Sequence, residues 1–239
     1  MDYDIFFCAT IIIAVFIIIY AHMKGKIDIS AVLASGFVGT IVLITLGERW
    51  RFIYMILGFF IFGNFITKYK YSIKEKRKVA EGIRTFRNVF GNGGAATLYS
   101  LFFFVTQSPV FLFGILGAMA TAAADTFATE IGQVHEKKPR LITNFKKVNV
   151  GRSGAVSTPG LIGSLIGSTL ISLIPLLFGS IPQVFLIGTV SGFLGCIVDS
   201  FIGATIERKK IDKHMTNFIA TFSGGAFATV LSAYSGIYI

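Results

Sequence analysis

Two aspartates lie within long apolar stretches of this 239-residue chain and are the residues best placed to do chemistry. Asp125 precedes Thr-Phe-Ala-Thr-Glu, and Asp199 precedes Ser-Phe-Ile-Gly-Ala-Thr-Ile-Glu. A carboxylate inside a membrane costs at least about 2.5 kcal/mol on insertion scales, so it is normally paired, bound to a metal or placed in a wet cavity. We therefore predict that Asp125 and Asp199 bind a metal or act in catalysis. The alternative is a structural pair with a neighbouring Lys, Arg or Asn.

A second candidate for chemistry is the polar segment 146–154, Lys-Lys-Val-Asn-Val-Gly-Arg-Ser-Gly. Its glycines allow close backbone approach, its cations supply charge and its polar groups supply hydrogen bonds, which are the ingredients of a phosphate site. It contains no Gly-Lys-Ser/Thr, so it is not a Walker A loop. Carboxylates beside a polyphosphate favour Mg²⁺, which binds one or two carboxylates, phosphate oxygens and water. The predicted phosphate-binding residues of this segment are Lys146, Lys147, Gly151, Arg152, Ser153 and Gly154.

The elements that must position these residues are membrane helices. The chain is 54% hydrophobic and only 14% charged, whereas soluble domains carry about 25% charged residues. This composition excludes a soluble globular enzyme and a disordered or fibrous chain. We predict an all-α polytopic membrane bundle of eight helices, because a crossing helix needs about 20 mostly apolar residues. The predicted spans are 5–22, 30–46, 51–67, 93–106, 110–131, 159–178, 183–206 and 217–237.

The orientation of the bundle follows from its 22 Lys and Arg residues. Twenty of them fall in alternate loops, 23–29, 68–92, 132–158 and 207–216, and two fall in the other loops. Since basic loops stay in the cytoplasm, we expect a multi-pass protein of the cell membrane with both termini outside and a cytoplasmic active site. The acidic residues before the first span argue against a cleaved signal peptide. Topology and anionic membrane lipid account for the net charge of +10, so we expect no nucleic-acid partner.

The spans also differ in their content of small residues. Spans four to eight are rich in Gly, Ala and Ser, which let helices approach closely, whereas spans one to three are Ile-rich. We predict a peripheral three-helix unit (1–67), a basic cytoplasmic loop (68–92) and a catalytic five-helix core (93–239). Spans four, six and eight are expected to begin on the basic side at Asn92, Ser157 and Thr216-Asn217, so their N-termini would face the phosphate site.

Several blocks of the chain resemble, in order, the family of integral membrane proteins that includes transmembrane protein 19 and the plant phytyl-phosphate kinase. The blocks are segments 88–96, 124–132, 139–143 and 150–157, together with Asp199-Ser200, Gly203-Ala204 and Asn217. The resemblance implies phosphoryl transfer from CTP or another nucleoside triphosphate, with Mg²⁺, to an isoprenyl monophosphate such as phytyl or geranylgeranyl phosphate. It implies a role in catalysis or metal binding for Asp125, Glu130 and Asp199. It adds Asn88, Asn92, Arg140 and Asn217 to the substrate-binding residues.

Three other functions stay open at this point. One is a cytidylyltransferase that forms a CDP-lipid, and another is a kinase that acts on a free lipid alcohol; these differ from the first function in their products. The third is a transporter of a phosphate-bearing solute, because membrane-embedded acids and internal repeats also suit that class. A transporter predicts uptake into vesicles without nucleotide turnover.

Overall fold

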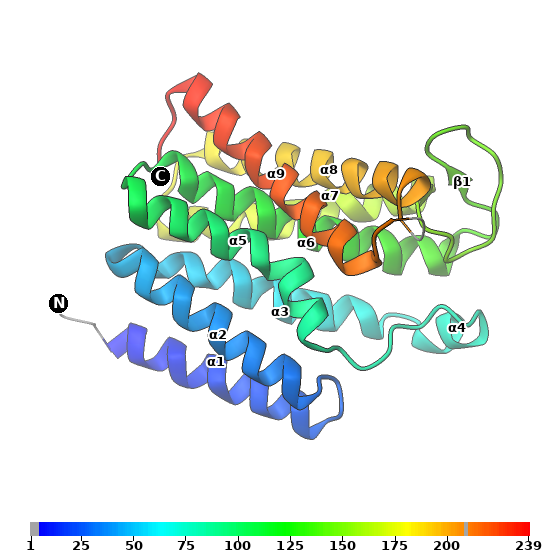
Figure 1. Cartoon of the computed structure of the whole chain (residues 1–239), viewed down its shortest axis with the longest axis horizontal. Helices are drawn as coiled ribbons and strands as arrows, with labels where there is room; N and C mark the ends of the chain where they lie inside the picture. The colour runs from blue at the N-terminus through cyan, green and yellow to red at the C-terminus, as the bar shows by residue number, and fades with distance from the viewer. Residues whose placement is uncertain (1–4, 208–209) are drawn as a thin grey trace.

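The computed structural model describes residues 5–207 and 210–239, and it shows long helices lying side by side (Figure 1). The helices are α1 (Ile5–Met23), α2 (Ile29–Leu46), α3 (Ile53–Lys68), α4 (Tyr71–Lys76), α5 (Phe86–Thr106), α6 (Val110–His135), α7 (Thr158–Ser172), α8 (Pro182–Thr205) and α9 (Lys213–Ser235). Two 3-10 helices span Gly47–Phe52 and Ile174–Phe178. Strands β1 (Arg140–Leu141) and β2 (Ala155–Val156) form a short antiparallel hairpin between α6 and α7.

The predicted all-α membrane bundle is confirmed. Within the described residues, seven helical stretches are long and apolar enough to cross a membrane. One of them, Ile29–Lys68, is divided by the 3-10 turn at Gly47, whose φ is +52°. Since α2 and α3 are therefore separate helices that run in opposite directions (Figure 1), the described part of the chain holds eight long helices.

The starts of two helices differ from the prediction. α5 begins at Phe86, and its cap is Thr85 rather than Asn92; the Thr85 amide donates to Asn88 Oδ1 at 2.9 Å. The predicted start was too late because polar residues in the first turns of α5 lower the hydropathy of a segment that is helical. α9 begins after Asp212, whose carboxylate caps the helix, and not at Thr216-Asn217. The predicted cap of α7 is confirmed, because Ser157 Oγ accepts from the amide of the third residue after it at 3.2 Å.

Helix α6 forms the centre of the bundle, in contact with α5, α7, α8 and α9 and with α3. Glycines make several of these contacts close. A Cβ on Gly117 would lie 2.3 Å from the Gly224 carbonyl oxygen of α9, and a Cβ on Gly167 of α7 would lie 2.4 Å from the Ala123 carbonyl oxygen. Small residues thus bring the backbones of three helices into direct contact.

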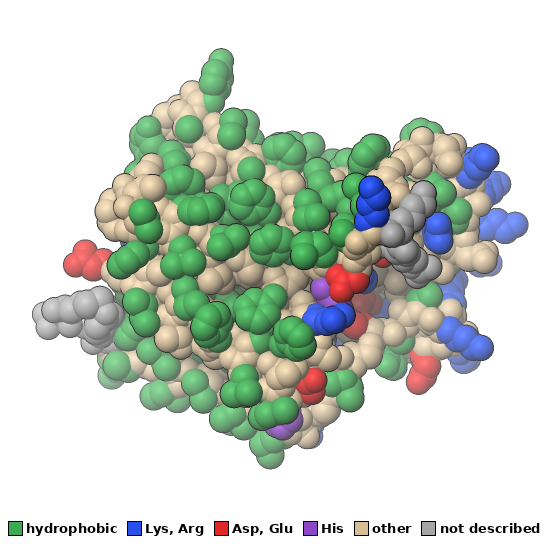
Figure 2. Space-filling view, viewed as in Figure 1, with side chains coloured by type: hydrophobic (Ala, Val, Ile, Leu, Met, Phe, Trp, Pro, Cys, Tyr) green, Lys and Arg blue, Asp and Glu red, His purple; other side chains and the backbone are tan. Residues whose placement is uncertain are grey.

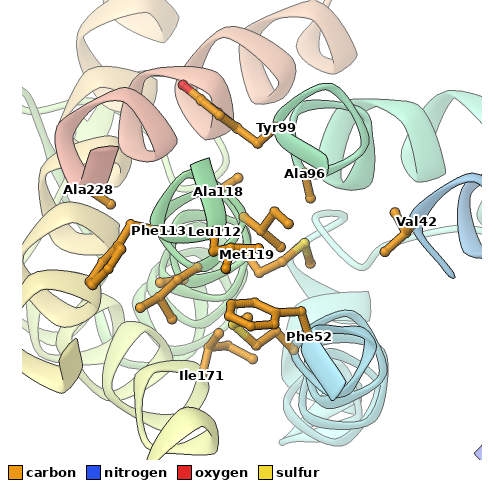
Figure 3. Packing of buried hydrophobic residues seen from close by; sticks show 14 of the residues in the cluster. Val42, Phe52, Ala96, Tyr99, Leu112, Phe113, Ala118, Met119, Ile171 and Ala228 are labelled. Atoms are coloured by element: carbon orange, nitrogen blue, oxygen red, sulfur yellow. The ribbon is translucent and has the colours of Figure 1, made fainter. Parts of the chain in front are cut away.

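The hydrophobic core surrounds α6 (Figure 3). Its residues Phe113 and Met119 are fully buried, and they belong to one cluster with Phe52 and Val42 from the N-terminal part of the chain. α2 packs along α5. α1 lies outermost, where Phe7 packs edge-on against Trp50 with the ring centroids 5.2 Å apart.

Charge gathers at one end of the bundle. Figure 2 shows hydrophobic side chains over the body and Lys and Arg side chains around the end that carries α4 and β1. Helices α6 and α8 run toward this basic end, and α5, α7 and α9 run in the opposite direction (Figure 1). The two helices that carry the membrane aspartates are therefore parallel and deliver them to the same end.

Candidate functional site

The structure brings Asp125 of α6 and Asp199 of α8 together at the basic end. The two carboxyl groups interact electrostatically, and both residues line a cavity of about 170 Å³. Asp199 Oδ2 is buried and has no hydrogen-bond partner among the described residues. A buried oxygen without a partner is costly, so it indicates a place where a ligand or water supplies the missing interaction.

The glycine-containing segment closes one side of this first cavity. Gly151 and Gly154 have φ values of +83° and +75°, a left-handed conformation that favours glycine. A Cβ on Gly154 would lie 2.2 Å from the Ala204 amide nitrogen, so the loop lies directly against the last turn of α8. Arg152 and Ser153 line the cavity between these two glycines. Four of the six residues predicted from this segment therefore lie beside the aspartates.

The N-terminus of α7 adds backbone donors to the same cavity. Ser157, which caps α7, and Gly160 in its first turn both line the cavity. The first turn of a helix offers unpaired N–H groups and about half a positive charge, which favour an anion. The first cavity thus combines helix donors, a glycine-containing loop, an arginine and two carboxylates.

A second cavity of about 280 Å³ is also lined by Asp125. It is lined by Asn88 and Asn92, one turn apart on α5, and by Asn217 of α9. The Asn217 amide group donates to Asn92 Oδ1 at 3.2 Å, while its own Oδ1 is buried without a partner in the described chain. These three residues were predicted to bind substrate, and the structure places them around one space.

Asp125 and Lys213 line both cavities, as do Thr129 and Gln133. Lys213 interacts electrostatically with Asp125 and Asp199, yet the sequence reasoning did not select it. It was one of four basic residues in a loop expected to end at 216. The signal that could have found it is Asp212, because an N-cap residue before an apolar run marks the first turn of a helix.

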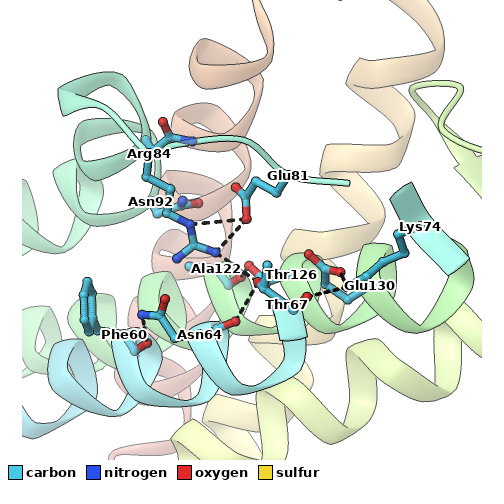
Figure 4. Close-up of polar contacts among 12 residues, drawn as sticks. Phe60, Asn64, Thr67, Lys74, Glu81, Arg84, Asn92, Ala122, Thr126 and Glu130 are labelled. Atoms are coloured by element: carbon cyan, nitrogen blue, oxygen red, sulfur yellow. Dashed lines mark hydrogen bonds and ion pairs between the residues drawn. The ribbon is translucent and has the colours of Figure 1, made fainter. Parts of the chain in front are cut away.

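Glu130 has a different environment from the two aspartates. Its carboxylate accepts a hydrogen bond from the Lys74 ammonium, and the two side chains are only 6% and 1% exposed (Figure 4). Lys74 also donates to the Thr67 carbonyl oxygen at 2.6 Å. The pair fastens α4 to the end of α3 and to α6. Glu130 lines the second cavity together with Asp125, whereas the first cavity is lined by Asp125, Asp199 and Glu207.

Three of the predicted substrate-binding residues lie outside both cavities. Arg140, Lys146 and Lys147 belong to the hairpin between α6 and α7 and are exposed. Arg140 donates to the Phe145 carbonyl oxygen at 3.0 Å, within the hairpin itself. The predicted set is therefore divided between a buried group at the aspartates and an exposed group on the hairpin.

The side chains at this site suit a metal ion that binds together with a phosphate group better than a metal ion held by protein ligands alone. In residues 5–207 and 210–239, no group of three or more His, Cys, Asp or Glu side chains is arranged to hold an ion. Mg²⁺ needs fewer, since it typically binds one or two carboxylates together with phosphate oxygens and water. Asp125 and Asp199, with the unpartnered Asp199 Oδ2, fit that requirement.

Comparison with known proteins identifies the family. Residues 12–237 match the family model described as integral membrane protein DUF92. The chain belongs to this family of integral membrane proteins and, with its apolar helices, is a multi-pass membrane protein. No solved structure matches it.

Three relatives show how far the likeness extends. The chain is 34% identical over 207 residues to an uncharacterized membrane protein of Methanocaldococcus jannaschii, covering 86% of this chain and 85% of the relative. It is 28% identical to Protein PGR of Arabidopsis thaliana, over 82% of this chain and 77% of that protein. It is 29% identical to the chloroplastic Protein VTE6 of Arabidopsis thaliana, over 77% of this chain and 59% of that protein. The family predicted from the sequence is thus confirmed.

Proposed function

We propose that this protein is a membrane kinase that transfers a phosphoryl group from a nucleoside triphosphate, with CTP as the expected donor, to an isoprenyl monophosphate. The product is the isoprenyl diphosphate. The observation that carries the proposal is the meeting of Asp125 and Asp199 at a cavity closed by the glycine loop and the α7 N-terminus. The family likeness, which includes VTE6 among the relatives, supports a prenyl phosphate as the acceptor.

The two cavities suit the two substrates. We assign the nucleotide phosphates to the first cavity, where Arg152, Ser153 and the first turn of α7 supply positive charge and donors. We assign the lipid phosphate to the second cavity, where Asn88, Asn92 and Asn217 supply hydrogen bonds. Lys213 lines both spaces. Donor and acceptor phosphates would then meet beside Asp125, which lines both cavities, and the transfer requires the attacking and leaving oxygens to lie in line through the γ-phosphorus.

The chemical step needs little from the protein beyond position and charge. An oxygen of the lipid phosphate attacks the γ-phosphorus, the bond to the bridging oxygen breaks, and the nucleoside diphosphate leaves with that electron pair. A phosphate monoester is already nucleophilic near neutral pH, so the site needs no strong general base. Mg²⁺ held by Asp125 and Asp199 would neutralise charge on the phosphates. Lys213 and Arg152 hold the phosphates in register for the transfer.

The test is an assay of products by mass. Purified protein is mixed with Mg²⁺, each nucleoside triphosphate in turn, and phytyl or geranylgeranyl monophosphate. We expect the diphosphate of the lipid, and we expect Asp125→Asn to abolish its formation while the protein still folds. The matched control is Glu48→Gln, which removes the charge of an exposed acid beside Arg49 in the turn between α2 and α3. An Asp125→Asn variant with wild-type turnover would refute the metal role.

The same assay separates the other functions. A CDP-lipid would indicate a cytidylyltransferase, and a monophosphate made from free alcohol would indicate a lipid-alcohol kinase. Uptake of a phosphate-bearing solute into vesicles without nucleotide turnover would indicate a transporter. Each of these results would replace the proposed function.

A further inference from the structure

An apolar groove runs between the N-terminal helices and α5. It has a cavity volume of about 220 Å³ and is lined by residues of α1, α2, α3 and α5 and by Met119 of α6. Ile18, Val38, Leu57 and Phe60 give it an aliphatic and aromatic wall. A space of this chemistry binds a hydrocarbon, since it offers contact area and few polar partners.

The groove has one polar end, formed by Arg84, Asn88 and Asn92, and the same three residues also line the second cavity beside Asp125. The two spaces therefore adjoin at these residues. The Arg84 side chain is only 14% exposed; its guanidinium pairs with Glu81 at 2.7 Å and donates to Thr67 Oγ1 at 3.2 Å. Figure 4 shows this arginine and Asn92 close together above α3, which also carries Phe60.

We propose that the groove binds the hydrocarbon chain of the isoprenyl phosphate, with the lipid phosphate at Arg84, Asn88 and Asn92. The inference rests on the proposed function for the identity of the head group. It assigns a substrate-binding role to α1, α2 and α3, which would hold the chain against α5. The groove has an apolar wall and an end lined by an arginine and two amides, and this end adjoins the cavity that contains Asp125. This order matches a lipid that has one hydrocarbon chain and a terminal phosphate.

The α2 wall of the groove leaves open space at two glycines. Gly36 and Gly39 both line the groove, and a Cβ on either would meet nothing within 4 Å. The space beside these glycines is therefore open. A larger side chain at either position would therefore enter the space that we assign to the hydrocarbon chain.

The first experiment fills the space beside these glycines. Gly39→Leu and Gly36→Leu place side chains inside the groove, and the control Leu33→Phe adds volume at an exposed position of the same helix. We expect the KM for geranylgeranyl monophosphate to rise about tenfold in the two glycine variants, the loss that follows when about two methylene groups lose buried contact. The KM for isopentenyl monophosphate, which is too short to need the groove, should change by no more than about twofold. An equal rise for both substrates would overturn the inference.

The second experiment does not need turnover. A geranylgeranyl monophosphate with a diazirine near the end of its chain is bound to the purified protein and photolysed, and the labelled peptides are read by mass spectrometry. We expect label on α1, α2 and α3, reduced in Gly39→Leu but not in Leu33→Phe, and displaced by unlabelled geranylgeranyl monophosphate.

These readouts separate the groove from the kinase. Label on α1 to α3 without any nucleotide turnover would support the groove and refute the proposed function. Normal turnover with label on the outer faces of α7 and α8 would refute the groove and leave the kinase intact. Displacement of the label by two-chain phosphatidic acid as readily as by the isoprenyl phosphate would also refute the groove, because the site would then be a general lipid surface.

Discussion

The buried pair of Lys74 and Glu130 allows a prediction about stability. The two side chains are 1% and 6% exposed, so neither charge can turn to water when its partner is removed. Replacing one member of such a pair leaves an uncompensated buried charge, which costs about 3–5 kcal/mol. We therefore expect Lys74→Met to lower the free energy of unfolding by about this amount. Replacing both members by apolar residues is often neutral, so Lys74→Met with Glu130→Leu should recover most of the loss.

The assay is equilibrium unfolding in mixed micelles with increasing SDS, followed by tryptophan fluorescence, since the chain has one Trp. The matched control is Lys76→Met, which removes an exposed lysine from the same short helix and should change stability by no more than about 0.5 kcal/mol. Equal losses for Lys74→Met and Lys76→Met would refute the reasoning, as would a double variant no more stable than the single one.

The double variant also tests the role predicted for Glu130. If the pair serves to hold α4 against α6, the stable double variant should keep phosphoryl transfer. If Glu130 acts on the substrate, as the family likeness implies, the double variant should be folded and inactive. The measurement is the rate of isoprenyl diphosphate formation in the folded double variant.

Two further predictions concern the loop and the helix ends at the basic face. Gly154→Ala should destabilise the protein by more than about 1 kcal/mol, because the φ of Gly154 is +75° and the new Cβ would lie 2.2 Å from the Ala204 nitrogen. The control is Gly25→Ala, where φ is +64° and a Cβ would meet nothing within 4 Å, so it should cost less in the same unfolding assay. Equal costs for the two variants would contradict the steric argument. The hydrogen bond from the Met215 amide holds the pKa of Asp212 below its ordinary value, so this cap stabilises α9 at neutral pH and its contribution should be lost as the pH falls through that lowered pKa. Asp212→Asn should remove this part of the acid dependence of unfolding, and an unchanged pH profile would contradict it.

The sequence was sufficient for the membrane class, the family and the common location of the two aspartates. Long apolar runs separated by basic loops define helices almost without ambiguity, since a bilayer requires them. Asp125 and Asp199 could be paired in advance because each lies a similar distance before the end of a helix that runs toward the basic side. Parallel helices with matched depths place such residues at the same level.

The other features depended on contacts that a single sequence does not show. Hydropathy placed the start of α5 seven residues late, because Asn88 and Asn92 read as loop residues although they belong to a helix face that lines a cavity. The density of positive charge favoured Lys146 and Lys147 as phosphate-binding residues, but the hairpin places both of them outside the cavities that contain the aspartates. The pairing of Lys74 with Glu130 joins residues 56 positions apart, and nothing in the local sequence of either residue indicates it.

The glycine contacts of α6 have a mechanical consequence. Where backbone lies against backbone, as at Gly117 and Gly167, a helix cannot slide without collision, since tightly packed interfaces do not deform gradually. Helices α6, α7 and α9 should therefore move as one rigid block. A movement that lets a lipid exchange with the bilayer would then be a movement of α1, because α1 lies outermost and is held by side chains such as Phe7. The lipid would reach its reaction partner sideways, from the plane of the membrane, while the nucleotide would come from the water.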